Sequence, residues 1–282
     1  MALGRVQCEQ LRTLVADYFA SNDIAITMGN DVVTETSGRQ WGLTSIIQLA
    51  AGTPQARWPE MIRWHFDAIG GLDTAIPKGL EEAAPRLRVR LGPRPDHIDM
   101  YTWRRVGPGL VETLMLQMHG AARNLPPETV AGWATDPEIV WKRARDNTLW
   151  DDPVERELMM SPKGGRVVHV TGGFFASSRL LALDRYLPVK CFEGALAMLP
   201  RRHSLLYVEV GEQLMTDLGA LLEVGLRFYV EGPGSTSGDV FWWRSGEVRR
   251  LARLRPSGPV IARSVWRDLM KATRLRPPVG VA

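Results

Sequence analysis

The run Gly165–Val210 constrains the fold of this chain more than any other segment. Residues 167–170 (VVHV) are mostly β-branched and are followed by a Gly-Gly turn, whereas residues 176–186 carry apolar side chains at helical spacing. Two further apolar runs, 191–199 and 204–210, flank a Pro-Arg-Arg-His turn. The run therefore predicts the order strand, helix, strand, strand. Because parallel neighbours need a crossover of about a dozen residues, the last two strands should be adjacent and antiparallel.

Apolar periodicity predicts further elements on both sides of this run. Helices are expected at residues 6–19, 43–51, 58–69, 126–133, 136–147, 212–230 and 263–273, and strands at 24–28, 32–34, 87–91, 110–118, 240–243 and 248–251. Within 87–91 (LRVRL) the alternation places the two arginines on a solvent-exposed face. These elements predict an α+β fold, with an N-terminal helix and hairpin followed by two mixed helix/strand halves packed around central sheets.

A polar, proline-bearing stretch, 151–164, is the candidate boundary within the chain. It would separate an N-terminal α+β half, 1–150, from a C-terminal α+β half, 165–276. One compact domain overall is the alternative, because 282 residues can fill one large core or two modest ones.

The composition fits a globular protein that works away from membranes. The chain is 45% apolar and 23% charged, and no apolar run approaches the ~20 residues of a membrane-spanning helix. Charge at Arg5 and Glu9 interrupts the N-terminus, where a signal peptide needs a long apolar stretch. Cys8 and Cys191 lie far apart in apolar surroundings, which favours reduced thiols over a disulfide. We therefore expect a cytoplasmic protein with no membrane partner.

Basic residues gather near the C-terminus. The chain has a net charge of +4, but residues 244–276 hold ten basic residues against two acidic ones, a local charge of +8. Such a cluster can attract an anionic partner such as a nucleic acid. A solvated face is the alternative, because 30 arginines against 5 lysines is the bias expected of a GC-rich coding sequence. Arg249 and Arg250 are neighbours on an expected strand, so they should point to opposite faces.

Two groups of residues are candidates for binding an anion or a partner: Arg201, Arg202 and His203 in one turn, and Trp242, Trp243, Arg244, Arg249 and Arg250 in the C-terminal hairpin. The turn could grip a carboxylate or phosphate, because arginine presents a bidentate fork and histidine titrates near neutrality. A polar turn that satisfies its own backbone groups is the alternative. The tryptophans could stack on bases or form a protein-binding patch. Adjacent strand residues face opposite sides, however, so core packing is the alternative for them.

No residue pattern predicts a catalytic centre. The five histidines are at least 22 residues apart, and neither a His-x-x-x-His nor a Cys-x-x-Cys spacing occurs. Ser177 lacks the flanking glycines of a nucleophile elbow, and we expect it in the first turn of a helix, where its hydroxyl can serve an amide. His169, between two valines, is interpreted as a solvated or core-bonded imidazole. We therefore predict no catalytic residue, no metal and no cofactor.

Five segments resemble, in shared order, the motifs of one bacterial family. They are LRVRLGP, the stretch from LMLQMHGAARN to KRARDNT with Trp133 and Ala144-x-x-Asn147, GGFFASSRLLALDRYLP, LPRRHSLLYVEV and STSGDVFWWRSGEVRRL, and they cover roughly residues 40–251. The chain thus resembles the uncharacterised YtpQ-like family, a domain of unknown function. His203 departs from the family, which has an acidic residue at that position. The resemblance implies a fold more than a function.

The sequence as a whole predicts a non-enzymatic cytoplasmic protein that binds another macromolecule, with a protein as the first candidate. The missing catalytic pattern, the ten tryptophans and the resemblance support this prediction. One alternative is nucleic-acid binding through the arginine-rich region 244–276. Another is a hydrolase whose site assembles only in three dimensions, for example around Arg202 and His203.

Overall fold

The structure, a computed structural model, describes residues 3–29, 32–36, 40–70, 77–95, 98–118, 121–189, 191–231, 234–255 and 257–274. The chain forms two compact units. The N-terminal unit comprises residues 1–74 with 119–121 and 230–234, and the main unit comprises the remainder. The sequence predicts a boundary at 151–164, but residues on both sides of that stretch belong to the main unit.

The N-terminal unit packs helices against a three-stranded antiparallel sheet. Its elements are α1 (Arg5–Ser21), β1 (Ile26–Met28), β2 (Val32–Glu35), β3 (Gln40–Gly42), α2 (Thr44–Ala51), the short turn η1 (Gln55–Arg57) and α3 (Trp58–Gly70). The core of this unit is aromatic, because the rings of Phe19, Trp41 and Phe66 lie 5.0 to 5.7 Å apart. The predicted helices and hairpin are confirmed, whereas β3 is an addition that the sequence does not predict.

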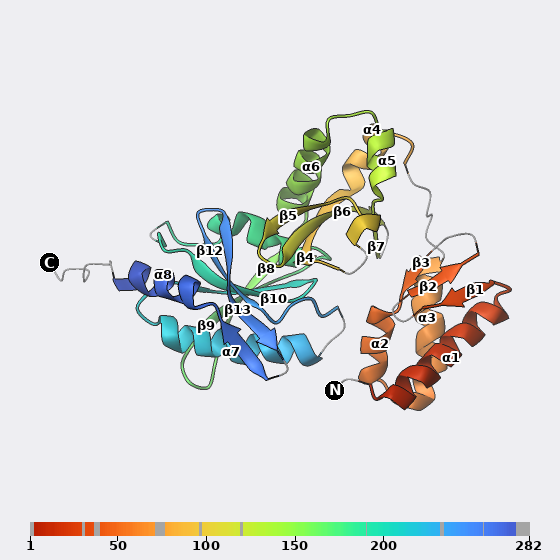
Figure 1. The fold of residues 1–282 in the computed structure, drawn as a ribbon, viewed down its shortest axis with the longest axis horizontal. Helices are drawn as coiled ribbons and strands as arrows, with labels where there is room; N and C mark the ends of the chain where they lie inside the picture. The colour runs from red at the N-terminus through yellow and green to blue at the C-terminus, as the bar shows by residue number, and fades with distance from the viewer. Residues whose placement is uncertain are drawn as a thin grey trace. The chain divides into compact units, whose positions relative to one another are not determined.

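The largest sheet of the main unit has seven antiparallel strands. Their order in space is β14-β13-β12-β10-β11-β9-β8, with bounds β8 (Glu155–Met160), β9 (Arg166–Thr171), β10 (Ala195–Arg201), β11 (Ser204–Glu209), β12 (Val240–Arg244), β13 (Glu247–Arg255) and β14 (Gly258–Ile261). Helices α7 (Leu214–Glu231) and α8 (Arg263–Arg274) pack their apolar side chains on one face of this sheet (Figure 1). The order predicted for residues 165–210 is confirmed, including the antiparallel pair β10–β11. The helix within it, η5 (Ala176–Arg185), is a 3-10 helix with a kink at Ala182.

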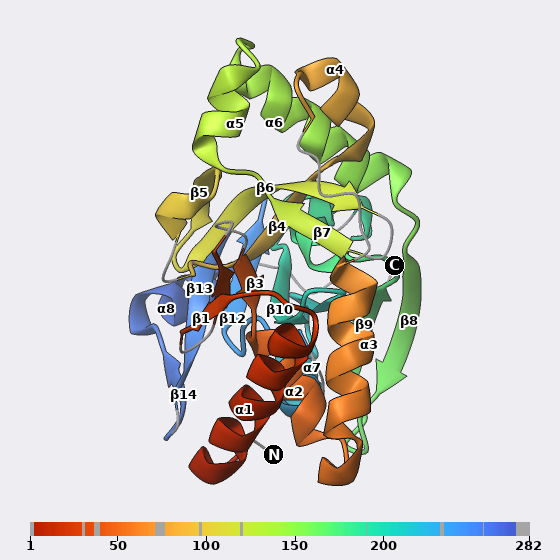
Figure 2. The same cartoon turned by 90° about the vertical axis from the view of Figure 1, so that its right-hand side faces the viewer.

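A second sheet of the main unit has four strands. They are β4 (Leu87–Pro93), β5 (Trp103–Gly107), β6 (Leu110–Met118) and β7 (Ala121–Asn124). The helical segments around this sheet are α4 (Leu80–Ala83), η2 (Ala84–Arg86), η3 (Ile98–Met100), α5 (Pro127–Gly132), α6 (Pro137–Asp146) and η4 (Asn147–Asp151). Helices α4, α5 and α6 lie on the side away from the seven-stranded sheet (Figure 1; Figure 2). Helix η5 packs against both sheets, so one apolar cluster joins them.

Two predictions about the main unit are wrong. Residues 155–160, placed by the sequence in a polar connector, form the edge strand β8, because pairing with β9 uses backbone groups and needs no apolar pattern. The arginines of β4, expected on a solvent-exposed face, are buried (Arg88) or half-buried (Arg90). Arg88 is 8% exposed and is bound by Asp152, while Arg90 lies beside the ring of Phe175.

A buried carboxylate ties the second sheet to α6. Glu112 of β6 is fully buried and accepts hydrogen bonds from Arg104 of β5 and from Arg145 of α6, the latter at 2.7 Å. Helix α6 begins as predicted, because the carboxylate of Asp136 accepts a hydrogen bond from the Glu138 amide at 2.9 Å. These contacts fix the sheet that carries the candidate site.

The α+β class is confirmed by the helices and antiparallel sheets of both units. Neither Cys8 nor Cys191 forms a disulfide, as predicted. Within the described ranges we find no helix with the length and apolarity that a bilayer crossing requires.

Candidate anion-binding site

Strand β4 is at the edge of its sheet, and side-chain hydroxyls cover that edge. The Val89 amide donates to Thr148 Oγ1 at 2.8 Å, and the Leu91 amide donates to Ser178 Oγ at 3.0 Å. Ser178 Oγ donates in turn to the Val89 carbonyl at 2.9 Å, and Ser177 Oγ donates to the Leu91 carbonyl at 3.2 Å. The Ser177 hydroxyl therefore forms its hydrogen bond with strand β4, whereas the sequence predicts a hydrogen bond within its own helix. The two serines fix η5 against β4.

This arrangement positions Arg90 where its guanidinium group is poorly solvated. The strand register places Arg90 in one cross-strand row with Thr113 of β6 and Trp103 of β5. The Nε atom of Arg90 is buried and has no hydrogen-bond partner among the described residues. The ring centroid of Phe175 lies 5.9 Å from the guanidinium carbon, a contact that stabilises the cation only modestly.

Arg88, two residues earlier on the same face of β4, shows how this fold neutralises a buried arginine. Its Nη2 atom lies 3.1 Å from Asp152 Oδ1, and its Nη1 atom donates to two backbone carbonyls. No carboxylate in the described part of the chain forms an ion pair with Arg90. Burial and the positive charge of Arg202 lower the pKa of Arg90 to about 9, although Tyr101 acts in the opposite direction. The protein by itself therefore stabilises the charged form of Arg90 poorly.

The second cation of the site, Arg202, comes from the turn between β10 and β11. Its backbone carbonyl accepts a hydrogen bond from the Ser177 amide at 3.2 Å, so the turn is tied to the serine pair that covers β4. Burial lowers the pKa of Arg202 as well. Guanidinium groups bind carboxylate or phosphate oxygens through paired, charge-assisted hydrogen bonds. The charge of Arg202 acts on Arg90, so the two guanidinium groups, which we call the arginine site, are candidates for binding one anion.

The other two residues of the predicted turn site, Arg201 and His203, have further contacts of their own. Arg201 Nε donates to the Phe228 carbonyl of α7 at 2.6 Å, and the Arg201 guanidinium carbon lies 5.0 Å from the centroid of the Phe228 ring. His203 is exposed, and its carbonyl accepts a hydrogen bond from Thr171 Oγ1 at 3.3 Å. Partial burial, Arg201 and Arg202 lower the pKa of His203, which keeps the imidazole neutral near pH 7. The predicted three-residue grip therefore stays a prediction: Arg201 also contacts α7, and the charges of both arginines act on His203.

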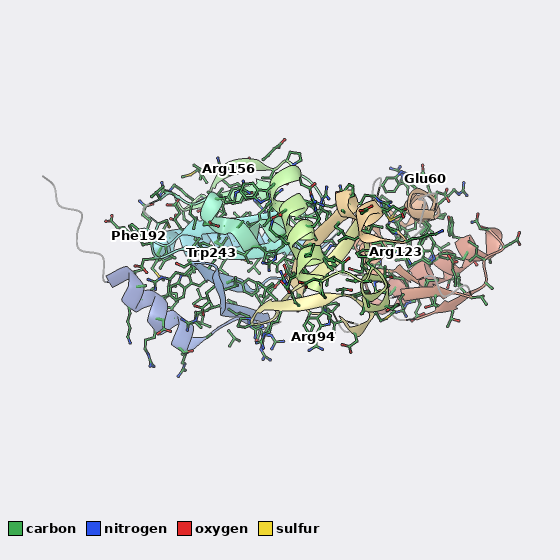
Figure 3. The ribbon with its side chains drawn as sticks, turned by 90° about the horizontal axis from the view of Figure 1, so that it is seen from above. Glu60, Arg94, Arg123, Arg156, Phe192 and Trp243 are labelled. Carbon is green, nitrogen blue, oxygen red and sulfur yellow. The ribbon has the colours of Figure 1, made fainter. Side chains whose placement is uncertain are left out.

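Trp242 and Trp243 lie in the core and form no stacking surface. They are 3% and 5% exposed. Trp242 belongs to the cluster under α7 and α8, and its Nε1 donates to the Glu193 carbonyl at 2.8 Å. Trp243, labelled in Figure 3, belongs to the cluster on the opposite face of the sheet. The core-packing alternative is confirmed for both tryptophans.

The arginines of the C-terminal hairpin separate instead of converging. Their ion pairs are Arg244–Glu193 at 3.0 Å, Arg249–Asp268 at 2.8 Å and Arg250–Asp239 at 3.4 Å. Arg249 is opposite Trp242 and Arg250 is opposite Phe241 in the β12–β13 register, so the two arginines occupy opposite faces, as predicted.

Helix α8 carries a separate basic stripe. Arg263, Arg267 and Lys271 recur at every fourth residue, which places them on one side of the helix, and all three are exposed. The sequence singles out the C-terminal charge but not this spacing. We call these three residues the α8 stripe.

A serine, a histidine and a carboxylate also meet in the main unit. His169 Nε2 lies 3.1 Å from Ser204 Oγ, and His169 Nδ1 lies 4.0 Å from Glu157 Oε2. Burial lowers the pKa of His169, so its imidazole is neutral near pH 7. Ser204 is only 1% exposed, and the Phe228 ring packs edge-on against the imidazole. A covered hydroxyl cannot reach a substrate, so this arrangement does not support the hydrolase alternative. The core-bonded interpretation of His169 is confirmed.

The described residues contain no group of three or more histidine, cysteine or acidic side chains that could hold a metal ion. Comparison with protein-family models, curated proteins and solved structures finds no match to this chain. The YtpQ-like resemblance therefore stays a prediction.

Proposed function

We propose that the protein is a non-enzymatic binding protein whose arginine site receives a carboxylate or phosphate group of a partner protein. The observation that carries the proposal is Arg90, whose buried Nε has no hydrogen-bond partner among the described residues. Arg88, on the same face of β4, is paired instead with the carboxylate of Asp152, which follows η4. An oxyanion from a partner would give Arg90 the equivalent counter-charge, and Arg202 would add a second guanidinium fork.

The proposal retains the cytoplasm as the location of the protein. Two cysteines outside any disulfide support a reducing compartment. The predicted YtpQ-like relationship is compatible with the proposal, because that family has no established activity.

Inorganic phosphate tests the arginine site directly. At constant ionic strength, phosphate should raise the melting temperature of the wild-type protein more than chloride does, because a ligand that binds only the folded state stabilises it. The gain should disappear in Arg90→Met and in Arg202→Met. It should persist in Arg105→Met, a matched control at an exposed arginine of β5. Equal gains in all four proteins would contradict the proposal.

Peptide titrations distinguish a protein partner from a small free anion as the ligand of the arginine site. If the partner is a protein, a short acidic or phosphorylated peptide should bind more tightly than inorganic phosphate in calorimetric titration, because flanking residues add contacts. The peptide should also lose affinity in Arg90→Met and Arg202→Met. Binding of phosphate with no gain from any peptide would leave the anion site intact and remove the protein partner from the proposal.

A second candidate function, nucleic-acid binding, is supported by the α8 stripe. Duplex DNA should then bind at ~50 mM salt and dissociate at ~300 mM, since each phosphate contact releases about one counterion. Neutralising Arg263, Arg267 and Lys271 together should abolish that binding, while Arg90→Met should leave it unchanged. Binding that survives the triple substitution would exclude the stripe as its site.

A further inference from the structure

Strand β8 is the exposed edge of the seven-stranded sheet (Figure 2). Among the described residues it pairs with β9 alone, in a register that runs from Glu155 opposite Thr171 to Met160 opposite Arg166. Five of its six residues are exposed, and they include two large apolar side chains, Leu158 at 60% and Met160 at 59%. The outer side of an edge strand presents backbone amides and carbonyls that can pair with another strand.

The side chains of β8 alternate between two faces that differ in charge. Arg156, Leu158 and Met160 share one face, so a cation is followed by two exposed apolar groups. Figure 3 shows Arg156 on the outside of the main unit. Glu155 and Glu157 share the other face, and both carboxylates are exposed. The edge therefore combines an outer backbone side that no described strand pairs with and a defined charge pattern.

We propose that β8 binds an extended segment of a partner protein by strand addition. Directly opposed residues of an antiparallel pair lie on the same face. The partner segment would therefore carry basic residues opposite Glu155 and Glu157, and apolar residues opposite Leu158 and Met160. Backbone hydrogen bonds would supply most of the affinity, and the charge pattern would select the partner. None of these residues belongs to the arginine site, so this proposal is independent of the proposed function.

A second copy of the chain is a poorer occupant of this edge. Two-fold symmetry centred on Arg156 would set that arginine against itself and Glu155 against Glu157. Centring on Glu157 would set that carboxylate against itself, and centring on Leu158 would leave both carboxylates without a cation opposite them. Like charges directly opposite destabilise a strand pair, so the charge pattern favours a foreign basic strand.

Two peptides and one double variant of the full chain test the proposal. In antiparallel pairing, the peptide Val-Ile-Val-Lys-Thr-Lys sets its lysines opposite Glu157 and Glu155, and Val-Ile-Val-Glu-Thr-Glu is the charge-reversed control. Fluorescence anisotropy should show that the wild-type protein prefers the lysine peptide at least about fourfold, because each cross-strand charge pair contributes roughly twofold. The double variant Glu155→Lys/Glu157→Lys changes only exposed side chains and should reverse the preference.

Backbone methylation of the lysine peptide separates strand addition from simple charge attraction. Only one alternate set of peptide amides faces β8, so N-methylation of that set should abolish binding, and methylation of the other set should be tolerated. Tolerance of both patterns, a preference that the double variant does not reverse, or no binding at about 1 mM peptide would overturn the proposal. A dimer of the wild-type chain that the double variant dissociates would assign β8 to a second copy and would overturn it as well.

Discussion

The substitution Arg90→Met should stabilise the protein, because it removes a charge that the folded state accommodates poorly and keeps an unbranched side chain. The fall in the pKa of Arg90 from 12.5 to about 9 corresponds to about 4–5 kcal/mol by which folding disfavours the charged form. The lost contact with the Phe175 ring offsets about 1 kcal/mol. Relaxation of the protein around the buried charge lowers the remaining free-energy penalty further. We therefore expect the free energy of unfolding to rise by about 1–3 kcal/mol.

Urea unfolding at neutral pH, followed by tryptophan fluorescence, measures this change. Arg88→Met is the matched comparison, because it leaves the carboxylate of Asp152 without its cation and should lower the free energy of unfolding by about 3 kcal/mol. Phosphate should reduce the difference in the free energy of unfolding between the wild-type protein and Arg90→Met, because only the wild-type protein has the Arg90 charge that binds phosphate. A loss of more than about 1 kcal/mol in Arg90→Met would refute the reasoning, because it would mean that the guanidinium contributes net stabilising contacts.

Three further predictions concern the fold. Glu112→Ala should lower the free energy of unfolding in urea by about 3 kcal/mol, because two partly buried arginines lose their carboxylate. At Gly194, where φ is +77°, a new methyl group would overlap the Trp243 carbonyl oxygen; thermal melts should therefore show a far larger loss for Gly194→Ala than for Gly246→Ala, where φ is +84° but the space is open. Burial lowers the pKa of His169 below the 6.5 of the unfolded chain, so this group stabilises the folded state above about pH 6.5, and that stability is lost as the pH falls. The melting temperature should accordingly drop less between about pH 7 and pH 5 in His169→Gln than in the wild-type protein.

The long periodic elements and the β1–β2 hairpin could be predicted from the sequence, whereas several other short strands could not. Strand β6 and helix α7 can be predicted because their nine and eighteen residues carry a clear apolar pattern. Strands β3, β5, β7 and β14 have only three to five residues, which is too few for a clear alternating pattern. Such segments become strands because a neighbouring strand supplies their hydrogen bonds. That strand is often far away in the sequence, so the local residue pattern does not reveal the pairing. Strand β8 is also missed by the sequence prediction. Its first three side chains are charged, so it has no apolar alternation, and it forms by pairing with β9.

Half of the candidate site could be predicted from the sequence. Arg202 is visible because a tight turn between two apolar strands concentrates polar side chains. Arg90 is not, because the alternation of LRVRL by itself places its arginines in water. Nothing in the local pattern signals that the ring of Phe175 lies beside Arg90 or that the charge of Arg202 acts on it. Phe175 and Arg202 come from other parts of the chain, so only the tertiary structure reveals that both act on Arg90.

The difference between Arg88 and Arg90 bears on why position 90 carries an arginine at all. Methionine or leucine would occupy the same space without a desolvated charge, so fold stability alone does not account for a guanidinium group there. An oxyanion present at a hundred times its dissociation constant would contribute about 2.7 kcal/mol to stability, which is close to the gain expected from Arg90→Met. The bound state of the wild-type protein and the unbound state of the methionine variant would then be similarly stable. The folded chain leaves the free-energy penalty of the Arg90 charge without compensation, and a bound oxyanion would compensate for it. This is the pattern expected of a binding residue.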